Sequence, residues 1–275
     1  MDKLKRAERL VAITHILTSR PNQLISLSSL AVRFGAAKST ISEDLLAVRE
    51  GLGFSGQGRL ETLAGAAGGA RFIPEISREE AITHVKEIAA CLSTSERVLA
   101  GGFLYMADVL FDPVRLRILG LIFAGAFRDK KPDAVATVET KGIPLAIATA
   151  EALGVPVAII RHGNKVTEGP SVSINYVSGS SRRIQTMSLS RRALEFHRNV
   201  LIIDDFMKAG GTARGMIDLL TEFSANVVGI GILTVDTIGR EPKLVTGYRS
   251  ILELSELDSS TGKAVVRPAA WVIDS

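Results

Sequence analysis

The fold of this 275-residue chain is decided by the stretch Val200-Leu-Ile-Ile-Asp-Asp-Phe-Met-Lys-Ala-Gly-Gly-Thr212. Its first four residues are apolar and predict a buried strand, which ends at the paired acids Asp204 and Asp205. The glycine pair predicts a turn, and the residues from Thr212 to Phe223 have the spacing of a helix. A strand that passes through a short loop into a helix is typical of an α/β sheet, whose ligands lie at the carboxyl ends of the strands.

The residues of this loop suit a phosphorylated sugar. Two adjacent carboxylates can accept hydrogen bonds from neighbouring hydroxyls of a ribose. Exposed amides at the start of a helix bind anions, to which Lys208 adds a positive charge and Thr212 a hydroxyl. The predicted ligand-binding residues of this stretch are Asp204, Asp205, Phe206, Met207, Lys208, Ala209, Gly210, Gly211 and Thr212.

A second loop of the same kind lies upstream. Thr140, Lys141 and Gly142 join an apolar run over 133–138 to a predicted helix over 142–153, and they are predicted to bind a further anionic group. Other predicted elements are helices over 78–92 and 112–127 and strands over 155–160 and 227–234. This alternation predicts the α/β class with a mostly parallel sheet.

The first 74 residues have the pattern of a winged helix-turn-helix. Helical spacing over 4–17 and 26–35 is followed by a third helical stretch over 39–49. Two β-prone runs between residues 59 and 73 flank a glycine-rich tip and predict the wing. The early residues of the third helix are expected to enter the major groove of DNA. The predicted DNA contacts are Lys5, Arg6, Lys38, Ser39, Thr40, Ser42, Gly68 and Arg71.

The net charge is concentrated on this N-terminal part. Residues 1–74 hold 10 basic and 6 acidic residues, a balance of +4, whereas residues 75–275 hold 23 of each and balance to zero. A basic unit beside a neutral one indicates that only the first meets a polyanion. The alternative is a three-helix dimerisation module with a hairpin. We therefore predict a DNA-binding domain over 1–74 and an effector-binding and dimerisation domain over 75–275.

The composition bears on the cellular compartment of the protein and on the kinds of binding site that it can contain. No apolar run approaches the roughly 18 residues of a membrane span, and the N-terminus lacks the pattern of a secretion signal. The single cysteine, Cys91, allows no internal disulfide, so a cytoplasmic protein is predicted. The four histidines lack metal-ligand spacing, and no metal site is predicted. Phe103 and Phe206 are predicted to pack in the core, with stacking on a nucleobase as the alternative.

The stretch at 200–212 resembles the phosphoribosyl pyrophosphate motif of type I phosphoribosyltransferases. The resemblance implies that Asp204 and Asp205 bind the ribose and that Lys208 to Thr212 bind its 5′-phosphate. It also implies that the loop at Thr140 to Gly142 holds the pyrophosphate. The fold implied is a winged helix-turn-helix followed by a type I phosphoribosyltransferase-like parallel-sheet domain.

Nearly the whole chain, to about residue 235, is similar to the purine operon repressors of Gram-positive bacteria. The motifs that carry this likeness include Gly65-Ala-Ala-Gly-Gly69, Thr140-Lys-Gly-Ile-Pro-Leu-Ala146, Asn164-Lys-Val-Thr-Glu-Gly169 and Ile184-Gln-Thr-Met-Ser188. The resemblance implies a homodimer that binds double-stranded DNA operators of purine biosynthesis and transport genes. The implied effector is phosphoribosyl pyrophosphate, with or without Mg²⁺, and guanosine tetraphosphate is a candidate competitor because it carries similar phosphates.

Two departures from the enzymes argue against catalysis. Where the hypoxanthine–guanine branch has an aspartate that acts on the purine N7, this chain has Lys208, which is no base at neutral pH. The second departure is that the segment 236–257 is short and shows no base-recognition set. A milder difference is Ala209, which stands where many relatives have threonine and so lacks one hydroxyl for the phosphate. The prediction is a sensor with no catalytic residue and no required cofactor. The alternative is an active purine phosphoribosyltransferase with a DNA-binding appendage.

A long basic hairpin is predicted between Arg161 and Arg192. Its cations include Lys165, Arg182, Arg183, Arg191 and Arg192. In phosphoribosyltransferases this region closes over the substrate. The alternative here is a basic surface that contacts DNA phosphates.

Overall fold

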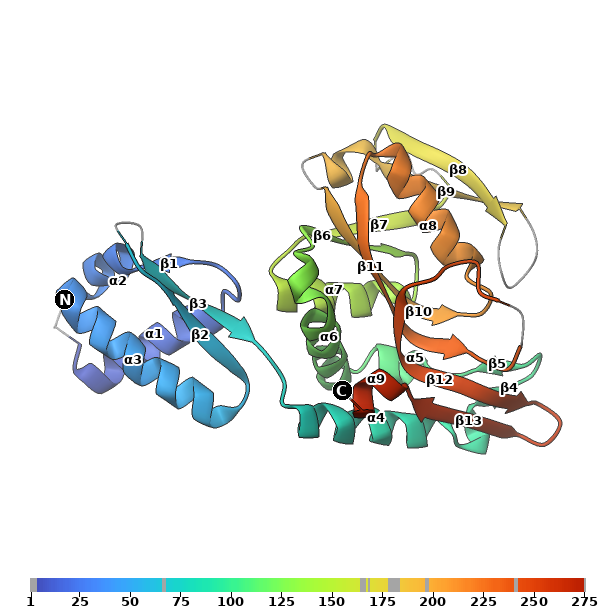
Figure 1. The fold of residues 1–275 in the computed structure, drawn as a ribbon, viewed down its shortest axis with the longest axis horizontal. Helices are drawn as coiled ribbons and strands as arrows, with labels where there is room; N and C mark the ends of the chain where they lie inside the picture. Colours follow the sequence, from blue (N-terminus) through green and yellow to red (C-terminus); the bar gives the residue numbers. More distant parts are fainter. Residues whose placement is uncertain are drawn as a thin grey trace. The chain divides into compact units, whose positions relative to one another are not determined.

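The computed structural model describes residues 4–65, 68–163, 167, 169–177, 184–195, 198–239 and 242–274 (Figure 1). They form two compact units, the first comprising Met1–Ser77 with the short segment Glu151–Gly154, and the second comprising Arg78–Ala150 and Val155–Ser275. The division after Ser77 lies shortly beyond the boundary predicted after residue 74. None of the described helices is long and apolar enough to cross a membrane.

The first unit is a winged helix-turn-helix, as predicted. Its elements are α1 (Arg6–Thr18), β1 (Ile25–Ser26), α2 (Leu27–Phe34), α3 (Lys38–Ser55), β2 (Gly58–Leu63) and β3 (Gly69–Pro74). The Ser26 hydroxyl accepts the amide of Ser29 and so begins α2, which ends at Gly35 with a φ of 56°. The strands pair antiparallel in the order β1-β3-β2. Ile13 of α1 and Ile41 of α3 are fully buried in the core beneath them.

The second unit contains the predicted α/β domain. Its elements are α4 (Arg78–Leu92), β4 (Val98–Leu99), β5 (Phe103–Leu104), α5 (Ala107–Leu110), α6 (Pro113–Phe127), β6 (Ala134–Val138), α7 (Gly142–Leu153), β7 (Val157–His162), β8 (Ser171–Val177), β9 (Ile184–Ser190), β10 (Asn199–Met207), α8 (Gly211–Glu222), β11 (Asn226–Asp236), β12 (Tyr248–Asp258), β13 (Lys263–Pro268) and α9 (Ala270–Asp274).

A mostly parallel sheet forms the centre of this unit. Among the described residues, eight strands pair in the order β13-β12-β11-β10-β6-β7-β9-β8. The strands from β12 to β7 are parallel, and antiparallel strands close both edges, β13 at one and the β8–β9 hairpin at the other. The predicted fold class is therefore confirmed.

Four features differ from the sequence prediction. Strand β10 extends to Met207, so the two acids and the two residues after them lie in the strand and not in a loop. The short β4–β5 hairpin was not predicted, and neither was the antiparallel pair β12–β13. The helix expected over 112–127 begins at Pro113, because the carboxylate of Asp112 caps it by accepting the amides of Val114 and Arg115.

Candidate effector pocket and nucleic-acid interface

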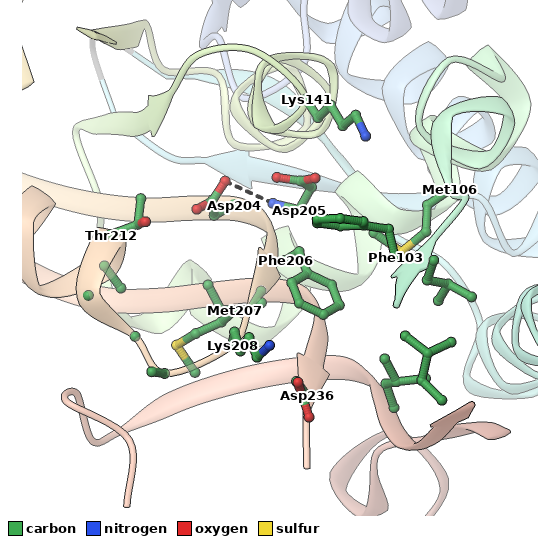
Figure 2. Close-up of a pocket in the computed structure, with 18 of the residues that line it drawn as sticks. Phe103, Met106, Lys141, Asp204, Asp205, Phe206, Met207, Lys208, Thr212 and Asp236 are labelled. Carbon is green, nitrogen blue, oxygen red and sulfur yellow. Dashed lines mark hydrogen bonds between the residues drawn. The ribbon is translucent and has the colours of Figure 1, made fainter. Parts of the chain in front are cut away.

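A cavity of about 410 Å³ opens at the carboxyl ends of the central strands of the second unit (Figure 2). Its lining residues are 101–104, Met106, Lys141, 204–213, Ile232, Asp236, Leu254 and Leu257. The fold thus brings Lys141 together with every predicted ligand-binding residue from Asp204 to Thr212. Thr140 and Gly142 flank Lys141 without lining the cavity.

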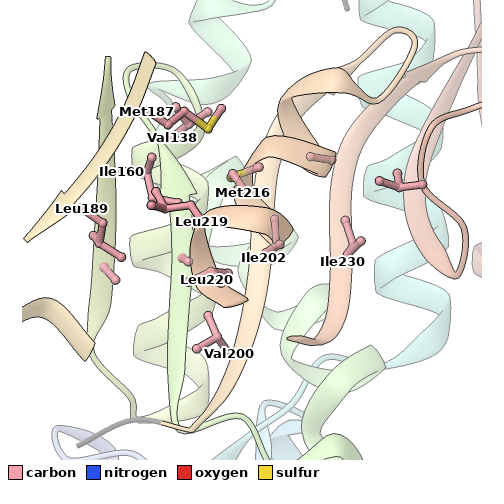
Figure 3. Packing of buried hydrophobic residues seen from close by; sticks show 14 of the residues in the cluster. Val138, Ile160, Met187, Leu189, Val200, Ile202, Met216, Leu219, Leu220 and Ile230 are labelled. Atoms are coloured by element: carbon pink, nitrogen blue, oxygen red, sulfur yellow. The ribbon is translucent and has the colours of Figure 1, made fainter. Parts of the chain in front are cut away.

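The position of the paired acids is fixed by the burial of the strand that carries them. Strand β10 pairs with β6 on one side and with β11 on the other. Val200 and Ile202 pack in the cluster that includes Met216 of α8, and Figure 3 shows that helix lying across the strand. Leu201 and Ile203, on the opposite face, are also fully buried. If β10 shifted by one residue against its neighbouring strands, each of its side chains would move to the opposite face of the sheet. The register of β10 is therefore firmly specified.

Asp204 and Asp205 concentrate negative charge at the end of this strand. Asp204 is 4% exposed, and its Oδ1 accepts the amide of Asp205 at 3.0 Å. Burial and the neighbouring charge of Asp205 raise the pKa of Asp204 well above its usual range. Burial also raises the pKa of Asp205, although the positive charge of Lys141 opposes that shift. A ligand that donates hydroxyl protons here stabilises the charged forms of both carboxylates.

The glycine loop, residues 208–212, connects β10 to α8 and supplies amide donors. Gly210 adopts a φ of 88°, which favours glycine, and it caps α8 without a side-chain hydrogen bond. Among the described residues, no side chain caps the first amides of α8, which lie at the positive end of the helix dipole. An anion in the cavity can accept them.

The second predicted loop is held in place from β7. The Glu139 carboxylate accepts the His162 amide at 2.6 Å and the Arg161 guanidinium at 3.1 Å. Burial alone would raise the pKa of Glu139, but these two donors lower it below its usual value. A charged, doubly anchored Glu139 fixes the start of the loop that carries Lys141.

Gly142 allows this loop to approach β10 closely, and we expect Gly142→Ala to disturb both. A Cβ at this position would lie 2.8 Å from Asp204 Oδ1 and would also collide with Thr137 Oγ1. The free energy of unfolding should fall by about 1–3 kcal/mol, the usual cost of overpacking, and affinity for an anionic ligand should weaken. Urea denaturation and calorimetric titration measure the two effects.

Gly125→Ala is the matched control, because a Cβ on that helical glycine meets open space. It should leave stability unchanged or raise it slightly. Equal stability of the two variants would contradict the close packing of Gly142.

An aromatic rim borders the cavity on the side of the β4–β5 hairpin. Phe103 is 64% exposed, so its predicted core position is wrong, and Figure 2 shows its ring beside Asp205 and Phe206. Asp236 also lines the cavity, and its Oδ1 accepts the Ile238 amide. Sequence reasoning missed the hairpin and Asp236. The only signal for the hairpin was the Gly101-Gly102 pair between apolar residues.

The basic hairpin between Arg161 and Arg192 lies against α8. Tyr176 of β8 is buried and packs against Gly215, where a Cβ would meet its ring at 2.9 Å. None of the described residues of this hairpin lines the cavity. Arg191 and Arg192 are exposed, whereas Lys165, Arg182 and Arg183 lie outside the described residues.

The start of α3 presents the predicted DNA-binding side chains to solvent. Lys38, Ser39 and Ser42 are exposed and Thr40 is half-buried, all in the first turns of the helix. Lys5 is exposed as well, at the start of α1. These positions suit contacts with phosphates and base edges.

Three predicted DNA contacts have other partners in the structure. Arg6 lies 3.4 Å from the buried carboxylate of Asp44, and Arg71 pairs with Glu61 at 2.6 Å. Both arginines therefore have part of their charge neutralised. Gly68 is buried, its amide donates to Gly65 and its carbonyl accepts Leu27. Both backbone polar groups of Gly68 thus already have a partner within the first unit, and its contact with DNA stays a prediction.

Two families match the two units in order. Residues 5–74 match the family described as "Bacterial purine repressor, N-terminal", and residues 108–260 match the "Phosphoribosyl transferase domain". The second unit is also similar in fold to adenine phosphoribosyltransferase of Rhodothermus marinus, with a TM-score of 0.53 and 23% identity over 63% of this chain and 99% of that one. The fold and the pocket therefore define a winged-helix protein built on a phosphoribosyltransferase domain.

Several relatives match over both units, among them the following two. The "purine biosynthesis transcriptional repressor PurR" of Bacillus subtilis is 50% identical over 93% of this chain and 90% of the relative. The "purine biosynthesis transcriptional activator PurR" of Lactococcus lactis is 42% identical over 93% of this chain and 94% of the relative. The chain belongs to this PurR family of purine biosynthesis transcriptional regulators.

Proposed function

We propose that this chain is a repressor of purine biosynthesis and transport genes whose affinity for operator DNA is modulated by phosphoribosyl pyrophosphate. The observation that carries the proposal is the joining of two sites in one chain. The first unit contains the exposed start of α3, which carries the basic residue Lys38. The second unit contains a cavity in which two carboxylates lie beside the N-terminus of α8. The carboxylates suit ribose hydroxyls, and the amides of the glycine loop suit its 5′-phosphate. Lys141 suits the pyrophosphate, with Mg²⁺ or without it.

A mobility-shift titration on the promoter of a purine gene tests this proposal. The apparent dissociation constant for DNA should change at least about fivefold on adding phosphoribosyl pyrophosphate, the lower end of ordinary coupling between two sites. A ribose 5-phosphate control separates the contribution of the pyrophosphate. The same affinity with and without the effector would contradict the proposal.

The second unit is proposed to act as a sensor and not as an enzyme. Lys208 lines the cavity where the hypoxanthine–guanine enzymes have an aspartate, and an ammonium cannot take a proton from a purine. The alternative, an active purine phosphoribosyltransferase, is favoured by the fold shared with the adenine enzyme of Rhodothermus marinus. Incubation with labelled phosphoribosyl pyrophosphate, Mg²⁺ and each purine base separates the two. Pyrophosphate release above background would support the enzyme.

Guanosine tetraphosphate is proposed to compete for the same cavity. Its pyrophosphate groups on a ribose carry the features that the two loops suit. In an equilibrium competition, it should displace labelled phosphoribosyl pyrophosphate completely. Additive binding of the two would place it elsewhere.

A homodimer in the cytoplasm is the proposed form of the regulator. Two-fold symmetric operators are matched by two-fold symmetric proteins, so paired half-sites would receive one first unit each. Sedimentation equilibrium gives the mass in solution. A monomer that binds operator DNA with one chain per site would contradict this assembly.

For the DNA contact itself, we expect Lys38→Ala to weaken binding to all DNA sequences. Removing one phosphate contact should reduce the slope of log affinity against log salt by about 1. Lys86→Ala, an exposed lysine on α4, is the matched control and should leave the slope unchanged. Anisotropy titrations between 50 and about 200 mM salt cover the useful range. An unchanged slope for Lys38→Ala would remove this lysine from the interface.

A further inference from the structure

Two backbone carbonyls of the glycine loop are held from outside the loop. The ammonium of Lys243 donates to the carbonyl oxygen of Lys208 at 2.5 Å, and the amide of Leu244 donates to that of Ala209 at 2.9 Å. Both donors belong to the connection between β11 and β12. We call residues 243–245 the strap.

The strap is itself anchored to the core of the second unit. Lys243 also donates to the carbonyl oxygen of Asp236, at the end of β11, at 2.5 Å. Val245 is 5% exposed and belongs to the same core cluster as Ile202 and Met216. Gly210 lies so close that a Cβ there would be 3.3 Å from Leu244 N and from Val245 Cγ2.

This arrangement determines which way the peptide groups of the loop face. A loop that binds an anion through its amides must turn its carbonyls the other way, and those carbonyls need donors of their own. The strap supplies donors for two consecutive carbonyls. It thereby orders the loop before any ligand arrives, which reduces the entropy that binding must offset.

We propose that Lys243 is a positioning residue that orders the glycine loop for the 5′-phosphate of the ligand. It acts through the Lys208 carbonyl and does not itself line the cavity. The proposal rests on the proposed function, because the 5′-phosphate is the group assigned to that loop. The proposal therefore predicts a different effect at each end of the ligand. Among the described hydrogen bonds, none joins the strap to the Thr140–Gly142 loop, which is proposed to hold the pyrophosphate.

The test compares Lys243→Met with Lys86→Met in the full chain, with ribose 5-phosphate and inorganic pyrophosphate as separate probes. Lys243→Met should bind ribose 5-phosphate about 10-fold more weakly, the effect of losing hydrogen bonds from a charged donor, and pyrophosphate within about twofold of wild type. Lys243→Arg, which keeps a charged donor, should recover part of the loss. Lys86→Met should bind both probes as wild type does.

Two outcomes would overturn the proposal. One is wild-type affinity of Lys243→Met for ribose 5-phosphate. The other is an equal loss for both probes together with a lower thermal midpoint, which would indicate a general structural role.

A second readout needs no ligand, so it separates this proposal from the proposed function. Hydrogen exchange of the amides at 209–212 should be faster in Lys243→Met than in Lys86→Met. If wild type bound neither probe while this difference appeared, the proposed function would fail and the ordering role of Lys243 would stand. Equal rates of hydrogen exchange in both variants would contradict the ordering role of Lys243.

Discussion

Replacing both Asp204 and Asp205 with asparagine is expected to lower affinity for phosphoribosyl pyrophosphate at least about 100-fold. Hydrogen bonds to a charged acceptor contribute about 1.5–3 kcal/mol each, and the variant replaces two charged acceptors with neutral ones. Every 1.4 kcal/mol corresponds to a factor of about 10 in the dissociation constant. Calorimetric titration measures the loss. Asp218→Asn, an exposed carboxylate on α8, is the matched control and should bind as wild type does. Retained affinity in the double variant would contradict the ribose assignment.

The same double variant is expected to be more stable than wild type at neutral pH when no ligand is present. The pKa of Asp204 is raised in the native state by burial and by the charge of Asp205, so this carboxyl keeps its proton to a higher pH than in the unfolded chain. Between the usual aspartate pKa and the raised native one, the native state binds more protons. Stability therefore falls as the pH rises through that window. The asparagines remove this dependence.

Thermal denaturation at pH 5 and pH 8 checks the sign of this effect. The second unit of wild type should lose more stability on going from the lower to the higher pH than that of the double variant. A gain on the order of 1 kcal/mol at pH 8 corresponds to roughly 2–4 °C for a unit of this size. The opposite sign would mean that the carboxylates are well solvated or paired in the free protein.

Asp44→Ala is expected to destabilise the first unit by about 3–5 kcal/mol and to abolish most DNA binding. Asp44 of α3 is 1% exposed, and its carboxylate accepts the guanidinium of Arg9 at 2.5 Å; the Arg9 side chain is 10% exposed. Removing one partner of a buried ion pair leaves the other charge uncompensated. A domain of this size has little more stability than that amount. Urea denaturation followed by circular dichroism, and anisotropy with operator DNA, measure the two losses.

Two further variants test whether the loss of stability comes from the buried ion pair. Glu50→Ala removes an exposed acid from the same helix and should change stability by no more than about 0.5 kcal/mol. Asp44→Leu combined with Arg9→Met replaces both charges with apolar side chains and should recover much of the lost stability. If Asp44→Ala were as stable as Glu50→Ala, the ion pair would not be what holds α1 against α3.

The parts of the structure that could be predicted are those whose signal is local in the sequence. The apolar run that ends in Asp204 and the Gly-Gly turn mark β10 and the start of α8, because burial, charge and backbone freedom all change within a few residues. The spacing of apolar residues likewise placed α4 and α6. The position of the pocket then follows from the general rule that ligands lie at the carboxyl ends of parallel strands.

The parts that could not be predicted depend on contacts between distant segments. Strands β4 and β5 have two residues each, which is too short for any periodic pattern, so Phe103 was placed in the core. Lys243 acts on a backbone carbonyl 35 positions away, and no residue type marks such a carbonyl in the sequence. Asp44 occupies a helix whose first turns are polar, and only the fold shows that it faces Arg9.

The buried carboxylates at the end of β10 also bear on how long a copy of the regulator survives in a cell. A ligand that satisfies them stabilises the folded state by mass action, and proteases act mainly on chains that have opened. Copies with an empty pocket should therefore be degraded sooner than occupied ones. The abundance of the regulator, and not only its occupancy on DNA, is then expected to follow the supply of the metabolite.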